Sequence, residues 1–90
     1  MSIYTLSDDV TWRDVDEEMI VLHLPTGKYY TFNNTGHLVW QQLAEGKDTA
    51  YITTQIMDKY EVDEETAARD LSVFISGLKE HNLISEKPNE

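Results

Sequence analysis

The sequence contains three histidines and several clusters of carboxylates. These are the side chains that could bind a metal ion or transfer protons. Imidazole and carboxylate groups hold metal ions or move protons when they converge at helical spacing or within one tight loop. His23, His37 and His81 fall in three different expected elements, and none has an acidic partner at helical spacing that also faces a core. We therefore interpret each histidine as a solvated or core-edge residue and predict no metal site.

The acidic clusters are better explained by turns and helix caps than by ligand binding. They occur at residues 8–9, 16–18 and 61–65, and they lack the glycine and the ligand spacing of a calcium loop. The sequence contains no cysteine, which excludes disulfides, thiolate metal sites and cysteine nucleophiles. It also has no phosphate-binding glycine loop, nucleophile elbow or zinc-protease motif. These patterns predict a protein that is not an enzyme and needs no cofactor.

The charge balance argues against nucleic acid as a partner. In 90 residues, 17 Asp and Glu oppose 7 Lys and Arg, so the net charge is −10. Neutralising phosphates requires clustered Lys and Arg, and the basic residues here never form a run. The sequence shows neither a basic-then-apolar leader nor a long apolar segment. It therefore predicts no signal peptide, no membrane span and a cytoplasmic location.

The elements that must position any functional residue change character near the middle of the chain. Residues 10–32 are rich in Val, Ile, Thr, Trp and Tyr, in short runs broken by turn residues, which predicts three strands in an antiparallel meander. Between the second and third strands, Pro25 presets φ for the first corner of a turn. Gly27 can take the left-handed conformation that a short hairpin loop demands.

Residues 34–81 carry apolar side chains three and four positions apart, which predicts three helices. The expected N-terminal caps are Asn33 or Asn34, Asp48 or Thr49, and Asp63. Gly46 is expected to end the first helix, and the third extends to about His81. We predict one domain over residues 1–84, followed by a flexible polar tail at residues 85–90. The order of elements indicates an α+β fold of the winged helix-turn-helix type.

The third expected helix allows two interpretations. Its apolar stripe is formed by Ala67, Ala68, Leu71, Phe74, Ile75 and Leu78. Val73 lies outside this stripe, and a single exposed valine needs no functional explanation. Alternatively, Asp70, Val73, Phe74 and Gly77 form one wall of a shallow groove, in which Gly77 lets another backbone approach closely.

The expected strand at residues 28–32 offers an opposing wall. A meander leaves edge strands with unpaired N–H and C=O groups, to which an extended peptide can add as a further strand. This strand has high β propensity and consists of Lys28, Tyr29, Tyr30, Thr31 and Phe32. The alternative is that its aromatic rings serve only the sheet and the core.

An ordered series of turn and core residues extends over about residues 8–85. Its members are Thr26, Gly27, Lys28, Tyr29, Tyr30, Phe32, Asn33, Thr35, Gly36, Trp40, Leu43, Gly46, Ile52, Ile56, Tyr60, Val62, Asp70, Phe74, Leu78, Leu83 and Ile84. The series resembles the PqqD-like family, the peptide-recognition elements of ribosomal-peptide biosynthesis. Phe32 departs from the leucine usual in the family, and the Pro-Glu and Gly-Trp features of the quinone-pathway members are absent. The chain looks most like the stand-alone recognition proteins of lasso-peptide clusters.

This resemblance implies a winged-helix-like, non-catalytic protein that binds the leader of a precursor peptide. The leader would lie antiparallel on the strand at residues 28–32, against the third helix, and be presented to a separate transglutaminase-like peptidase or another modifying enzyme. Carried onto this sequence, the peptide-binding residues are Lys28, Tyr29, Tyr30, Thr31, Phe32, Ala67, Asp70, Val73, Phe74 and Gly77.

Four expectations about partners and function remain open at this point. The protein is expected to be a monomer or a weak dimer. A winged-helix transcriptional regulator is the first alternative function. A chaperone for a radical-SAM peptide-modifying enzyme is the second, and a domain that only docks to an enzyme, without a groove of its own, is the third.

Overall fold

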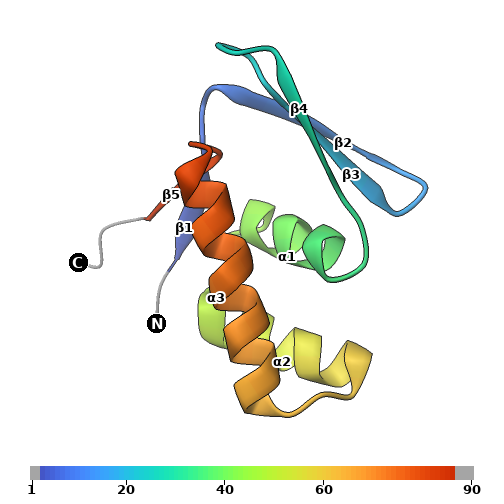
Figure 1. Ribbon diagram of the computed structural model, residues 1–90. Helices are drawn as coiled ribbons and strands as arrows, with labels where there is room; N and C mark the ends of the chain where they lie inside the picture. The colour runs from blue at the N-terminus through green and yellow to red at the C-terminus, as the bar shows by residue number, and fades with distance from the viewer. Residues whose placement is uncertain (1–2, 87–90) are drawn as a thin grey trace.

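The computed structural model of the chain describes residues 3–86. A three-stranded antiparallel sheet consists of β2 (Val10–Val15), β3 (Glu18–His23) and β4 (Lys28–Phe32). The helices α1 (Thr35–Ala44), α2 (Thr49–Tyr60) and α3 (Glu64–Glu80) follow (Figure 1). This order confirms the predicted α+β class, with a meander before three helices.

Two further strands were not predicted. β1 (Tyr4–Leu6) and β5 (Ile84–Glu86) form a separate antiparallel pair, in which Tyr4 lies opposite Glu86 and Leu6 opposite Ile84. The pair lies beside α1 and α3 and joins the first and last described segments of the chain (Figure 1). The tail predicted to start at residue 85 is therefore wrong for Ser85 and Glu86, because both residues belong to β5. Residues 87–90 lie outside the described residues.

The two hairpins of the sheet use different turn chemistry. Asp16 and Glu17 alone connect Val15 to its partner Glu18, and both adopt positive φ values, 51° and 66°. The second hairpin contains Gly27 at φ 72°, as predicted, and its N–H donates to the His23 carbonyl at 2.8 Å. The strand order is β2-β3-β4, which leaves β4 at one edge of the sheet.

The pairing register separates the sheet into two faces. Trp12, Val21 and Tyr30 lie side by side on the inner face, which packs on α1. Arg13, Ile20 and Thr31 lie side by side on the opposite, outer face. Since successive side chains of a strand alternate between faces, every residue of β4 is assigned to one face by this register.

The core extends from the inner face of the sheet through all three helices, and Trp40 of α1 is one of its fully buried side chains. Trp40 is completely buried, with the ring of Trp12 edge-on at 6.5 Å and the ring of Phe32 at 5.8 Å. His37 on α1 also reaches the sheet, where its Nε2 lies 3.0 Å from Asp14 Oδ2. Aromatic packing and this polar contact together fix α1 beneath the inner face.

The helix ends mostly follow the predicted caps. The side chains of Asp48 and Asp63 accept hydrogen bonds at 2.8 Å from the backbone N–H groups of Tyr51 and Thr66, respectively. Asn34 occupies the cap position of α1 but makes no side-chain cap bond, because its backbone is at φ 52° and ψ −123° rather than extended. Among residues 3–86, no helix is both long enough and apolar enough to cross a membrane.

Candidate peptide-binding site

The edge strand β4 and the helix α3 are joined by two pairs of aromatic rings. The rings of Phe32 and Phe74 have centroids 5.0 Å apart and lie nearly perpendicular, at 82°. The rings of Tyr30 and His81 have centroids 5.1 Å apart. Edge-to-face and tilted ring pairs of this kind attract because the positive ring edge meets the negative ring face. The two pairs hold α3 beside β4 at two positions along the helix, Phe74 and His81.

These contacts establish which side of α3 faces the strand. At about 100° per residue, Asp70, Gly77 and His81 all fall within roughly 60° of Phe74 around the helix axis. Phe74 and His81 touch β4, so the same side of the helix carries Asp70 and Gly77 toward the strand. Val73 projects next to this stripe and is 69% exposed, which confirms that it lies outside the core.

We name this region the β4–α3 surface. It comprises Lys28, Tyr30, Phe32, Asp70, Val73, Phe74, Gly77 and His81.

Two glycines near this surface have opposite surroundings. A Cβ on Gly36 of α1 would lie 3.0 Å from the Phe32 Cβ and 3.2 Å from the Phe74 Cε1, so the absence of a side chain there lets the two rings meet. A Cβ on Gly77 would meet no atom within 4 Å, and this residue has no positive φ. The packing of the protein itself therefore gives no reason for a glycine at position 77.

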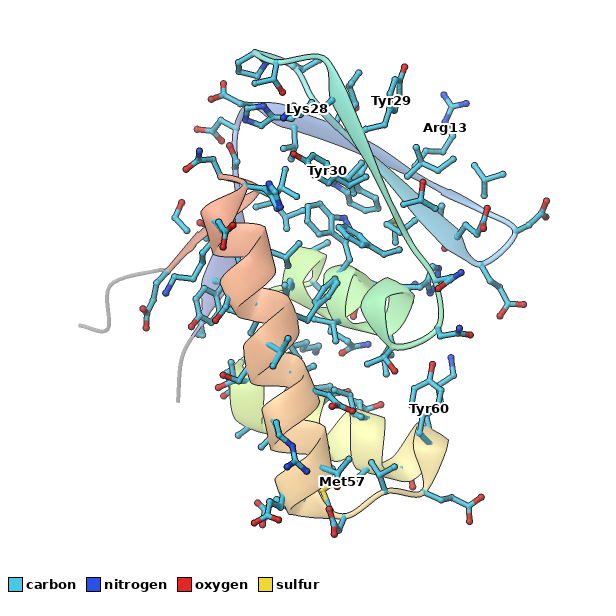
Figure 2. The ribbon with its side chains drawn as sticks, in the orientation of Figure 1. Arg13, Lys28, Tyr29, Tyr30, Met57 and Tyr60 are labelled. Atoms are coloured by element: carbon cyan, nitrogen blue, oxygen red, sulfur yellow. The ribbon has the colours of Figure 1, made fainter. Side chains whose placement is uncertain are left out.

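The five predicted binding residues of β4 divide between the two faces of the sheet. Lys28, Tyr30 and Phe32 belong to the inner face, whereas Tyr29 and Thr31 belong to the outer face. Figure 2 shows Tyr29 and Tyr30 pointing in different directions from the strand. Tyr29 is 69% exposed, whereas Tyr30 is half-buried against the core. The side chains of β4 thus cannot all face one bound peptide.

Charges of opposite sign lie at the two ends of the β4–α3 surface. Asp70 lies one helical turn before Phe74, whereas Lys28 starts β4, two residues before Tyr30. Both charged side chains are exposed. Within residues 3–86, no three His, Asp or Glu side chains are grouped so that they could hold a metal ion. The surface offers a free strand edge, aromatic rings and a charge at each end.

The chain matches the family described as Coenzyme PQQ synthesis protein D (PqqD) over residues 18–84. The chain belongs to the PqqD family. Among solved structures it is similar to TbiB1 in complex with the TbiA(beta) leader peptide, with 34% sequence identity, a TM-score of 0.88, and 94% of this chain and 99% of that chain covered. No curated protein matches the chain.

A second similar solved structure is a lasso peptide synthetase B1 complexed with the leader peptide. It has 27% sequence identity and a TM-score of 0.84, with 91% of this chain and 96% of that chain covered. These matches confirm the predicted resemblance, and they extend over nearly the whole fold, including regions outside the family match.

Two predicted details of this PqqD-family site need correction. Ala67 is completely buried in the core, because it lies on the inward side of α3 with Leu71, so its side chain is not available to a peptide. His81 was not predicted as part of the site, although its ring contacts Tyr30. Its position seven residues after Phe74, on the same helical stripe, was the signal that could have identified it.

Proposed function

We propose that this protein is a non-catalytic leader-peptide-binding protein of lasso-peptide biosynthesis. One observation carries the proposal: the free edge of β4 lies beside the exposed stripe of α3, in a chain whose fold matches two proteins solved with leader peptides. The leader adds as a fourth strand next to β4 and contacts α3 with part of its side chains. Its backbone supplies hydrogen bonds to the free edge, and its side chains supply specificity.

The alternation of side chains along a strand defines how the leader is recognised. Every second leader residue points toward the helices, where Tyr30, Phe32 and Phe74 provide apolar and aromatic contacts. The intervening residues point to the outer face, next to Tyr29 and Thr31. The residues that bind the leader are thus Lys28, Tyr29, Tyr30, Thr31, Phe32, Asp70, Val73, Phe74 and Gly77.

The end charges favour one kind of leader. A peptide antiparallel to β4 has its N-terminal part near Phe32 and Asp70 and its C-terminal part near Lys28. A basic residue in the N-terminal part and an acidic residue in the C-terminal part would therefore be complementary to this surface.

The protein works together with a separate enzyme in this proposal. The bound leader is presented in the cytoplasm to a transglutaminase-like leader peptidase. A DNA-binding role is disfavoured, because the first turn of α3 carries Glu64 and Glu65, which repel phosphates.

Titration of the purified protein with the leader of a precursor peptide encoded beside its gene tests this function. Fluorescence polarisation should give a Kd in the nanomolar to micromolar range, or about 8–12 kcal/mol of binding free energy. A scrambled leader of the same composition is the control and should bind at least tenfold more weakly. Equal affinities for both peptides, or no binding of either, would sink the proposal.

A further inference from the structure

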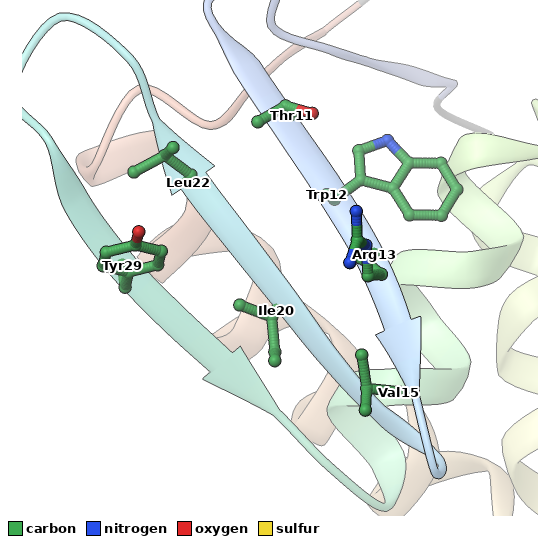
Figure 3. Close-up of a pocket in the computed structure, with 7 residues that line it drawn as sticks. All are labelled: Thr11, Trp12, Arg13, Val15, Ile20, Leu22 and Tyr29. Atoms are coloured by element: carbon green, nitrogen blue, oxygen red, sulfur yellow. The ribbon is translucent and has the colours of Figure 1, made fainter.

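A polar hollow lies where the turn between β3 and β4 meets the segment that follows α3. It is separate from the hollow on the outer face of the sheet, whose floor is formed by Ile20, Leu22 and Tyr29 (Figure 3). We name the polar one the turn hollow, and its volume is about 390 Å³. The polar residues that line it are Ser7, Asp9, His23, Asn82 and Ser85.

Backbone hydrogen bonds fix the walls of the turn hollow relative to one another. The Ser7 N–H donates to the Leu83 carbonyl at 2.9 Å, which joins the segment between β1 and β2 to the segment after α3. The Leu24 N–H donates to the Asp9 carbonyl at 2.8 Å, which joins the same segment to the β3–β4 turn. The hollow is therefore formed without a ligand, so binding there does not have to order its walls.

His23 is a buried polar residue in the wall of this hollow. Its exposed fraction is only 8%, and its Nδ1 lies 2.9 Å from Thr26 Oγ1. The Thr26 oxygen also accepts from the Lys28 N–H at 3.3 Å, so we assign the Thr26 hydroxyl as the donor to Nδ1 and the ring proton to Nε2. Since Thr26 does not line the hollow, the ring edge that does is the one with Nε2.

The Nε2 atom of His23 and the carboxylate of Asp9 both lack a hydrogen-bond partner within residues 3–86. Buried polar groups are normally paired, so a free donor on a buried ring calls for an acceptor from a ligand. The Asp9 carboxylate, in contrast, calls for a donor. The turn hollow therefore offers one unused donor and one unused acceptor.

We propose that the turn hollow binds the leader segment that follows the residues added to β4, an inference that rests on the proposed function. Each peptide unit of such a segment has a carbonyl, which can accept from His23 Nε2–H, and an N–H, which can donate to Asp9. Asp9 is the only charged residue that lines the hollow. A phosphate or another anion does not fit, because this carboxylate repels it.

The turn hollow begins where the β4–α3 surface ends. A leader antiparallel to β4 leaves this surface at Lys28, which directly follows the β3–β4 turn and its Pro25 (Figure 2). Across the surface, the ring of His81 contacts Tyr30, and the next residue is Asn82. Because Pro25 and Asn82 both line the hollow, a leader that continues past Lys28 reaches it directly. The segment between the added strand and the cleavage site would thus be held in a defined path.

Leader peptides shortened from the C-terminus one residue at a time test this proposal. The series starts from the leader of a precursor encoded beside the gene, and fluorescence polarisation measures each Kd. Removal of the residues that lie beyond Lys28 should weaken binding at least fivefold. The remaining short leader, which occupies only the β4–α3 surface, should still bind.

Asp9→Ala removes the acceptor of the hollow and keeps the backbone carbonyl that Leu24 uses. It should weaken binding of the long leader at least fivefold and leave the affinity for the short leader within twofold. Asp8→Ala is the matched control, because Asp8 is the neighbouring exposed aspartate and does not line the hollow. This control should leave both affinities within twofold of the wild type.

The ring nitrogens of the histidines give a readout that needs no substitution. In nitrogen-15 NMR spectra, the long leader should shift the Nε2 signal of His23, because this atom gains an acceptor. The short leader should leave His23 unchanged and shift only His81, whose ring belongs to the β4–α3 surface.

Three results would overturn the proposal. The first is equal affinity of the wild type for the long and short leaders, and the second is equal binding of the long leader by Asp9→Ala and Asp8→Ala. The third is a His23 signal that shifts when residues 87–90 are removed but not when the leader binds, which would assign the hollow to the end of this chain. A failure of the leader-binding function is distinguishable, because the short leader would then not bind either.

Discussion

Val73 is the large apolar side chain of α3 that is exposed, and it borders the stripe that faces β4. Val73→Glu should weaken leader binding at least tenfold, because a buried carboxylate against the apolar peptide loses its hydration. The melting temperature should stay within about 4 °C, since exposed substitutions usually change stability by less than about 0.5 kcal/mol. Polarisation and thermal denaturation measure the two effects. A collapse of the melting temperature would attribute the lost binding to a disrupted fold and not to a lost leader contact.

Gly77 gives a second test at the scale of one residue. Alanine is favoured over glycine inside a helix by about 1 kcal/mol, and the position has room for a methyl group. Gly77→Ala should therefore raise the melting temperature by about 4–8 °C. It should nevertheless weaken leader binding, because the methyl group occupies space next to Phe74 that the peptide needs.

Ser76→Ala is the matched control for Gly77→Ala. Ser76 is exposed on α3 and lines a different hollow, together with Lys79. The alanine variant should gain some stability without any change in leader affinity. If Gly77→Ala binds the leader as tightly as Ser76→Ala does, the glycine is not a contact residue.

Residue-scale prediction from the sequence succeeded where helical periodicity alone decides the outcome. Angular spacing on a helix predicts that Phe74 and Gly77 share one side of α3, and the contact of Phe74 with Phe32 places that side toward β4. That these residues bind a peptide stays a prediction. Periodicity places Ala67 in the apolar stripe of α3, and only the family resemblance assigned it to the peptide; its complete burial agrees with the stripe.

The β2–β3 hairpin contains strain that a substitution can relieve. Glu17 has a φ of 66°, a conformation that costs a non-glycine residue about 1 kcal/mol or more. Asp-Gly is the preferred pair for a two-residue turn of this kind. Glu17→Gly should therefore raise the melting temperature by several degrees. Glu18→Gly, one residue later in β3, is the control and should lower it, since glycine weakens a strand.

The cap of α3 makes stability depend on pH. A hydrogen bond from the side chain of Thr66 is the main cause that holds the pKa of Asp63 below its ordinary value, and the hydrogen bond from the backbone N–H of Thr66 is the second. A carboxyl whose folded-state pKa is lowered stabilises the protein above its unfolded-state pKa, and the effect disappears as pH falls through the folded-state pKa.

Thermal melts of Asp63→Ala should show this dependence. The variant should melt below the wild type at neutral pH, and the difference should shrink as the solution becomes more acidic than the ordinary Asp pKa. Asp58→Ala, an exposed residue of α2 without a cap role, should show no such convergence. A difference for Asp63→Ala that stays constant with pH would contradict the cap mechanism.

At the scale of elements, strong local signals were sufficient for the meander and the three helices. Alternating apolar residues, Gly27, Gly46 and two aspartate caps all lie within or next to the element that they define. β1 and β5 were missed because each is three residues long and is stabilised by a partner about 80 residues away. No local sequence pattern reveals a strand partner so far away in the chain. For the same reason the predicted domain ended at residue 84, whereas β5 extends to Glu86.

The acidic clusters of the molecule lie at turns and helix starts, at residues 8–9, 16–18 and 61–65, and not within β4 itself. A net charge of −10 accelerates the approach of a leader with a basic segment and acts over roughly 10 Å at 0.1 M salt. The association rate constant should fall between 50 and 500 mM salt, while the dissociation rate constant changes little. Stopped-flow polarisation separates the two constants. An association rate that does not depend on salt would leave the charge only a solubility role.

The pairing of β1 with β5 also determines how the chain responds to a pulling force. Tyr4 lies opposite Glu86, so the outer ends of both strands are at the same end of the ladder. Force applied at the two termini therefore loads the ladder one hydrogen bond at a time, from its outer end inward. Antiparallel strands pulled in this direction unzip, whereas strands pulled along their length must shear all bonds together. Under tension this short ladder opens first, and the β4–α3 surface stays folded until higher loads.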